Sequence, residues 1–172
     1  MAAAAAVSGA WAVPGVLRPY DLVTLAGLAR GRRVDEIAAA VGSPYETVRN
    51  RVLRMRQRMG AVSCAHAVAI AYRRGWLSGL AAEPRPYVWL SGRQRQVLAL
   101  MADGLTNSAI AVALGISEDT ASTYARRIYT AFNVSRGGIT PALAARCHAI
   151  ALAYQHGYLE PAPAAPARRT VA

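Results

Sequence analysis

Residues 104–128 read GLTNSAIAVALGISEDTASTYARRI, and this stretch decides the fold of the chain. Its first part predicts a short helix that is opened by Thr106 or Asn107 and closed by Gly115. Ser117 then caps a second helix, whose first turn holds two acidic residues where the helix dipole favours negative charge. A helix, a short turn containing glycine and a second helix form the helix-turn-helix signature.

The same signals extend this pattern on both sides into a unit of four helices. Ser91 is placed to cap a helix that ends before Gly104, and the helix after Ser117 continues to about Asn133. A fourth helix is expected over residues 141–156, because its first residue is a proline, which suits a first helical turn. Short helices bury little surface individually, so the four must pack as one small bundle.

The first half of the chain repeats this unit. A shift of 73 positions aligns Gly31 with Gly104, Ile37 with Ile110, Gly42 with Gly115 and Thr47 with Thr120. A shift of 82 positions then aligns His66 with His148, Tyr72 with Tyr154 and Gly75 with Gly157. The helices expected in the first copy are Tyr20–Ala29, Val34–Val41, Pro44–Met59 and Ala65–Arg73. So many ordered matches indicate a duplication.

These patterns predict an all-α protein with two tandem four-helix domains. Residues 17–77 form the first domain and residues 90–159 the second, with a proline-containing linker over residues 78–89. Residues 1–16 are interpreted as a disordered leader and residues 160–172 as a disordered tail. The tyrosines that align on the two fourth helices are interpreted as packing residues, and the aligned histidines as packing or surface residues.

The charge of the chain favours a polyanionic partner. Its formal net charge is +11, and all twenty basic residues are arginines. GC-rich codon usage is one reading of this bias, and the bidentate fit of a guanidinium to phosphate or guanine is the other. Both readings are compatible with binding to double-stranded DNA.

Several other classes of protein lack support in the sequence. Cys64 and Cys147 are too few for a disulfide framework, and we interpret them as buried free thiols. No spacing suggests a metal site or a cofactor, and no nucleophile–base pair suggests an enzyme. No apolar run is long enough to span a membrane, so a cytoplasmic, nucleoid-associated location is expected.

The second copy closely resembles the LuxR/GerE-type helix-turn-helix domain. The residues that carry the resemblance are Leu90, Arg93, Gln94, Val97, Leu98, Gly104, Thr106, Asn107, Ile110, Ala111, Leu114, Ile116, Ser117 and Thr120, and then Arg126, Arg127, Ile128, Tyr129 and Val134. The first copy is a more diverged match. The resemblance implies a four-helix domain whose third helix enters the major groove of DNA and whose last helix often forms a dimer contact.

The candidate DNA-binding residues follow from this alignment. In the first copy they are Arg32, Arg33, Thr47, Arg49, Asn50, Arg51 and Arg54; in the second they are Thr106, Asn107, Ser122, Thr123, Tyr124, Arg126 and Arg127. Thr106 and Asn107 have two readings, a phosphate contact or simple helix capping. Arg56 and Arg58 are assigned to phosphates or to solvent, because five arginines on one helix cannot all face one groove.

Three functional interpretations are open at this stage. In the first, both units act as a built-in pseudo-dimer of a sequence-specific transcription regulator, with the fourth helices paired. In the second, one unit binds DNA and the other docks a protein such as RNA polymerase or another regulator. In the third, the chain coats DNA without sequence preference. The fourth helices are also the expected surface for any self-association.

Overall fold

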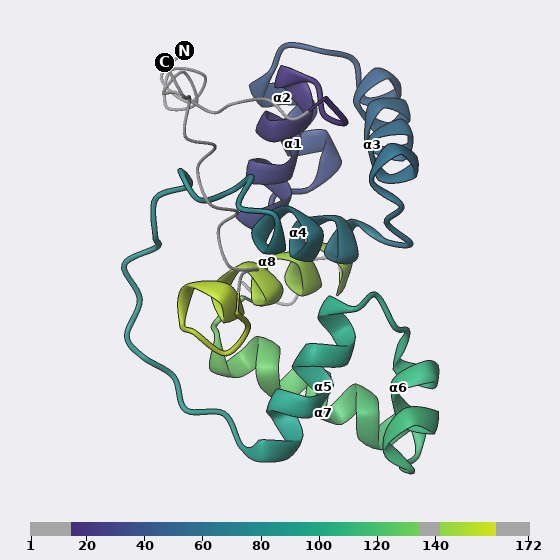
Figure 1. Ribbon diagram of the computed structural model, residues 1–172, viewed down its shortest axis with the longest axis vertical. Coiled ribbons are helices and arrows are strands. Elements are labelled where there is room, and N and C mark those ends of the chain that lie inside the picture. Colours follow the sequence, from purple (N-terminus) through teal and green to yellow (C-terminus); the bar gives the residue numbers. More distant parts are fainter. Residues whose placement is uncertain (1–14, 135–141, 161–172) are drawn as a thin grey trace, which may run out of the picture.

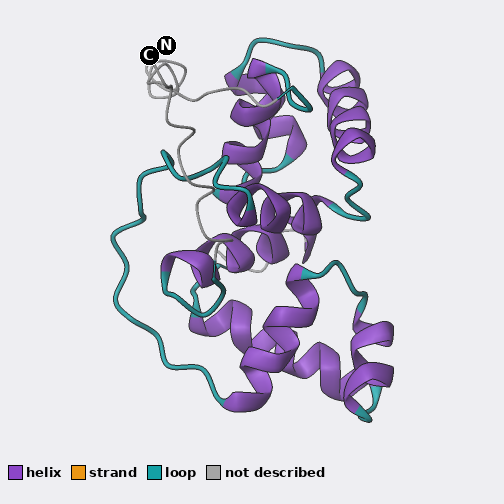
Figure 2. Cartoon of the chain, viewed as in Figure 1, coloured by secondary structure: helices purple, strands orange, loops and turns teal. Residues whose placement is uncertain are grey.

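The computed structural model describes residues 15–134 and 142–160, and within these ranges the chain is entirely helical (Figure 2). Eight helices are described: α1 (Pro19–Ala29), α2 (Val34–Ala40), α3 (Tyr45–Met59), α4 (Cys64–Arg73), α5 (Gly92–Ala102), α6 (Asn107–Leu114), α7 (Glu118–Ala131) and α8 (Ala142–Gln155). The prediction of an all-α fold is confirmed for this part of the chain. The expected leader and tail lie mainly outside the described residues.

Helix starts in the second half follow the side-chain caps that the sequence predicts. The Ser91 hydroxyl accepts a hydrogen bond from the backbone N–H of Gln94, and the backbone N–H of Ser91 donates to the side-chain oxygen of Gln94, which completes a capping box. The hydroxyls of Thr106 and Ser117 cap α6 and α7 by accepting the backbone N–H of Ala109 and of Thr120. Gly115 ends α6 with φ of 63°, a conformation that glycine adopts without a steric penalty. These local predictions are confirmed.

Some helix ends differ from the prediction. Helix α7 ends at Ala131, two residues before the expected Asn133, and Asn133 itself takes a positive φ of 50°. Helix α4 begins one residue early, because Ser63 rather than Cys64 accepts the capping bond from the N–H of His66. The predicted proline start of α8 lies outside the described residues.

The two halves pack against each other through four helices (Figure 1). Helices α4 and α8 lie side by side in the middle of the molecule, α1 packs against both α4 and α8, and α5 packs against both α8 and α4. The buried side chains of both halves form one continuous cluster, from Leu17 to Tyr154. Helices α2 and α3 extend from this centre on one side, and α6 and α7 on the other.

The predicted packing residues lie at the contact between the halves. Tyr72 of α4 and Tyr154 of α8 stack with their ring centroids 4.9 Å apart and their planes 5° from parallel. His148 is buried, and His66 is half-buried. The packing role predicted for the tyrosines is therefore confirmed, and both histidines follow the packing alternative of the two predicted for them.

The two cysteines are buried free thiols, as predicted. Burial raises the pKa of both thiols, with a further increase at Cys147 from its neighbour Cys64. Within the described residues, no group of histidine, cysteine, aspartate and glutamate side chains is arranged to hold a metal ion. None of the helices described combines the length and apolarity needed to cross a membrane.

Candidate nucleic-acid interface

Helices α6 and α7 form the helix-turn-helix of the second half. Ile110 and Ala111 of α6 face Ala121, Ala125 and Ile128 of α7 in the core, and this packing fixes the angle between the two helices. The opposite side of α7 is left open to solvent. An exposed helix held by its buried face against a short capped helix is the geometry that presents side chains to a DNA groove.

The open side of α7 gathers most of the candidates from the second half. Arg126 and Arg127 are exposed, Ser122 and Thr123 are half-exposed, and a guanidinium nitrogen of Arg126 lies 3.3 Å from the hydroxyl of Thr123. Thr123, Arg126 and Arg127 also line a shallow hollow on this side. Tyr124 does not lie on this open side. Each residue of a helix is rotated by about 100° from the one before it, and this rotation turns the Tyr124 ring toward the core, where it packs.

Thr106 and Asn107 have different surroundings. The hydroxyl of Thr106 is exposed and accepts the N–H of Ala109, as the capping interpretation requires. The amide of Asn107 is turned inward and bonds to Ser122 of α7 and Arg146 of α8. Arg146 was not a candidate, and nothing in its local sequence marks it.

In the first half, α3 corresponds to α7 and presents a mixed surface. Arg49, Asn50 and Arg54 are exposed, and Arg49 lies 3.2 Å from the carboxylate of Glu46. The side chain of Leu53, between them, is 49% exposed. Thr47 is half-buried at the start of the helix.

Arg51 does not share the exposed surface of α3 that holds Arg49, Asn50 and Arg54. Its guanidinium lies over the ring of Tyr20, 4.3 Å from the centroid, in a cation–π contact with α1. Arg51 and Arg49 therefore flank opposite sides of α3. The structure brings Arg49, Asn50 and Arg54 onto one exposed surface and places Arg51 at its margin.

The assignment of Arg56 and Arg58 to phosphates or solvent needs correction. Arg58 bonds to the buried carboxylate of Asp21 at 2.5 Å and to the carbonyl of Val16. Arg56 donates to the carbonyl of Val62. Both guanidiniums tie α3 to neighbouring segments, Arg58 through the carboxylate of Asp21 and Arg56 through the carbonyl of Val62.

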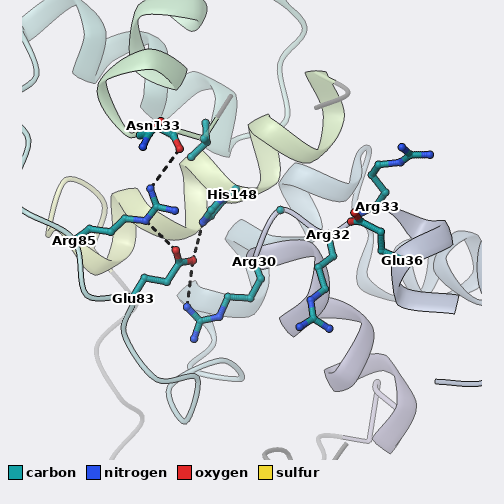
Figure 3. A pocket seen from close by; sticks show the side chains of 10 residues that line it. Arg30, Arg32, Arg33, Glu36, Glu83, Arg85, Asn133 and His148 are labelled. Atoms are coloured by element: carbon teal, nitrogen blue, oxygen red, sulfur yellow. Dashed lines mark hydrogen bonds and ion pairs between the residues drawn. The ribbon is translucent and has the colours of Figure 1, made fainter. Parts of the chain in front are cut away.

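Arg32 and Arg33 lie in the turn before α2, away from the exposed face of α3. Arg33 pairs with Asp35 at 2.7 Å, and its backbone N–H donates to Glu36. Both arginines line an open cavity of about 620 Å³ between the two halves (Figure 3). In Figure 3 the side chain of Arg33 points out of this cavity.

Glu83, from the segment expected to be a linker, lines this cavity. Its carboxylate lies 2.7 Å from Nε2 of His148, 3.2 Å from Arg30 and 2.9 Å from Arg85 (Figure 3). The backbone of Glu83 also bonds to the amide of Gln155. A segment expected to be a plain linker therefore connects α1 to α8.

The ionisation of this cluster follows from its contacts. Burial by itself would raise the pKa of Glu83, but His148, Arg85 and Arg30 together lower it below its ordinary value. Burial lowers the pKa of His148, and Arg85 and Arg30 oppose its protonation, while Glu83 acts in the other direction. At neutral pH, an uncharged His148 therefore donates its Nε2–H to the carboxylate.

We expect the stability of the protein to fall as the pH is lowered from 7 to about 3, with the histidine contribution lost first and the glutamate contribution lost below about pH 4.3. Both folded-state pKa values are depressed, so the stabilisation is present above the unfolded-state values, about 6.5 for histidine and 4.3 for glutamate, and is lost as the pH falls through the folded ones. Glu83→Gln should lower the free energy of unfolding by about 1–2 kcal/mol at pH 7. This deficit should shrink as the pH falls, because Glu83 of the unmodified protein then protonates as well. Urea titrations at several pH values measure it.

Glu160→Gln is the matched control, because it makes the same chemical change at an exposed glutamate. It should alter the free energy of unfolding by less than about 0.5 kcal/mol at each pH. Equal effects of the two substitutions would contradict the role given to Glu83.

Comparison with known protein families identifies one segment. The family model described as bacterial regulatory proteins, luxR family (GerE), matches residues 88–136. Searches of curated proteins and of solved structures gave no match. Residues 88–136, which include α5, α6 and α7, are a GerE/LuxR-family helix-turn-helix domain. This family points to a DNA-binding transcription regulator.

Proposed function

We propose that this protein is a sequence-specific regulator of transcription that uses two helix-turn-helix units of one chain as a built-in dimer. In this arrangement α3 and α7 are the two recognition helices, and α4 and α8 form the contact between the units. Double-stranded DNA is the partner. The proposal extends the identified domain at residues 88–136 to the first half of the chain.

The reciprocal contacts between the halves are the observation that carries this proposal. A Cβ placed on Gly31 would lie 2.8 Å from Nδ1 of His148, and one placed on Gly104 would lie 3.0 Å from Nδ1 of His66. The sequence alignment makes Gly31 equivalent to Gly104, and His66 equivalent to His148. A contact and its exchanged counterpart are both present, which is the property of a two-fold interface.

The tyrosine stack supports the same symmetry. Tyr72 and Tyr154 occupy aligned positions on α4 and α8 and contact each other. A residue on a two-fold axis contacts its own equivalent, so this pair marks the position of the proposed axis. Helices α3 and α7 lie on opposite sides of the α4–α8 pair (Figure 1).

Footprinting of the full chain on selected DNA tests this proposal. Two units of one chain should protect two half-sites whose centres are about 34 Å apart, one turn of the duplex. Sedimentation of the complex should give one chain per protected site. Protection of a single half-site, or two chains on a two-half-site operator, would contradict the built-in dimer.

A second candidate function rests on the surface of α3. Leu53 aligns with Arg126 of α7, and its exposed apolar side chain stands where the second unit offers a guanidinium. Tyr45, at the start of α3, is also 49% exposed. In this version α7 binds DNA and α3 docks a protein such as RNA polymerase or another regulator. Leu53→Ala should then reduce transcriptional activation while leaving DNA affinity unchanged.

A further inference from the structure

Three side chains from three helices form a hydrogen-bonded relay in the second half. Asn107 of α6 has its Nδ2 atom 3.1 Å from the hydroxyl oxygen of Ser122 in α7. Its Oδ1 atom lies 3.3 Å from a guanidinium nitrogen of Arg146 in α8. The other terminal nitrogen of Arg146 donates to the carbonyl of Leu105. The relay therefore joins the helix that contacts the first half to the exposed helix α7.

The chemistry of these groups fixes the direction of each hydrogen bond. A guanidinium only donates, so the atom of Asn107 that faces Arg146 must be the amide oxygen. The amide nitrogen then faces Ser122 and only donates, which obliges the Ser122 oxygen to accept. The single hydroxyl proton of Ser122 is left to bond to another acceptor.

The hydroxyl of Ser122 is half-exposed and lies on the same helix as Thr123 and Arg126. Its aligned residue in the first half is Arg49, whose guanidinium can only donate hydrogen bonds. The residues aligned with Asn107 and Arg146 are Val34 and Cys64, whose side chains offer no amide or guanidinium. The relay is a property of the second half.

We propose that Arg146 and Asn107 are positioning residues that orient the Ser122 hydroxyl as a hydrogen-bond donor toward the major groove. At the base that faces Ser122, the protein then favours guanine or thymine, whose groove edges offer acceptors, over cytosine, which offers a donor. This inference rests on the proposed DNA-binding function and adds a specificity determinant to it.

Asn107→Asp reverses the relay and is the decisive substitution. An aspartate carboxylate still accepts a hydrogen bond from Arg146, but it has no proton to donate to Ser122. The Ser122 hydroxyl therefore donates its proton inward to the carboxylate, and the lone pairs of the Ser122 oxygen face the DNA. Selection from random DNA pools should show guanine and thymine preferred over cytosine by about threefold to tenfold in the unmodified protein. In the Asn107→Asp variant this preference should be lost or inverted at that position alone.

Two further variants separate orientation from charge. Ser122→Ala should remove the preference, and the addition of Asn107→Asp to Ser122→Ala should leave base selection unchanged. Asn133→Asp introduces the same charge at an exposed residue near the end of α7, and it should weaken binding evenly across sequences. If circular dichroism shows that Asn107→Asp does not fold, Arg146→Met provides the test, because it frees the amide to rotate and should make the bases nearly equivalent.

The outcomes distinguish the relay from the proposed function. Unmodified protein that binds a two-half-site operator, with a base preference that neither Asn107→Asp nor Arg146→Met changes, would overturn the relay alone. A preference that survives Ser122→Ala would overturn it as well. Failure of the unmodified protein to bind any selected DNA would overturn both.

Discussion

Replacing Gly31 by alanine is expected to lower the free energy of unfolding by about 2–5 kcal/mol. Gly31 has φ of 70°, where an alanine costs about 1–2 kcal/mol. The added Cβ would also lie 2.8 Å from Nδ1 and 3.1 Å from Cβ of the buried His148, and overpacking of this kind costs about 1–3 kcal/mol more. Urea denaturation at pH 7 measures the sum.

Gly42→Ala is the matched control for this prediction. Gly42 has φ of 62°, but nothing lies within 4 Å of the position of its added Cβ, so only the backbone penalty of about 1–2 kcal/mol applies. The second half offers the same comparison, because a Cβ added to Gly104 would meet Val62 and His66, while nothing lies within 4 Å of one added to Gly115. Equal losses of stability within each pair of variants would contradict the overpacking expected at Gly31 and Gly104.

Loss of the arginines on the two exposed helices is expected to have the largest effect on DNA binding. Arg126→Ala and Arg49→Ala should each weaken binding to the selected operator by about 1–3 kcal/mol, fivefold to 150-fold, if each contacts a base edge. Each should also relax base preference at its own half-site only. Fluorescence anisotropy with operators altered in one half-site at a time measures both effects.

Arg74→Ala is the control for these substitutions. Arg74 is exposed at the end of α4, where its guanidinium lies 5.1 Å from the ring of Trp76, and its loss removes the same charge. It should change affinity by less than about threefold, with no change in base preference. An effect of Arg126→Ala without any effect of Arg49→Ala would favour the version in which only the second unit binds DNA.

These tests use the full chain for a structural reason. The sequence alone suggests that each copy could be expressed separately. The buried side chains of the two halves, however, belong to one cluster, and α1 and α5 each pack against the closing helix of the other half. A separated half would expose that apolar surface, so its behaviour would not represent the unit in the intact protein.

Local sequence signals predicted most of the helices. Serine and threonine caps set the starts of α5, α6 and α7, and glycines with positive φ end several helices, because these effects act within a few residues. The buried thiols and the packing role of Tyr72 and Tyr154 were also predicted, but the stacking of the two rings was not. Their apolar surroundings repeat at helical spacing, which indicates a core position.

The surroundings of the arginines could not be predicted in this way. Helical periodicity placed Arg51 near the exposed face, but it does not reveal that Tyr20 of α1 lies beside it. Similarly, Arg58 looked like a phosphate contact because its partner Asp21 is 37 positions away. The partner of a long charged side chain depends on which helices meet, and that information is not local.

The stretch at residues 104–128 by itself determined the helix-turn-helix, because capping, glycine turns and the spacing of apolar residues are short-range effects. Tertiary structure alone decided which side chains face outward together and how the halves meet. It turned Asn107 toward Ser122 and Arg146, and it placed Glu83 among Arg30, Arg85 and His148. Apart from the pair of Glu83 and Arg85, which are two positions apart, those contacts join residues 15 to 65 positions apart, so they arise only when the helices pack.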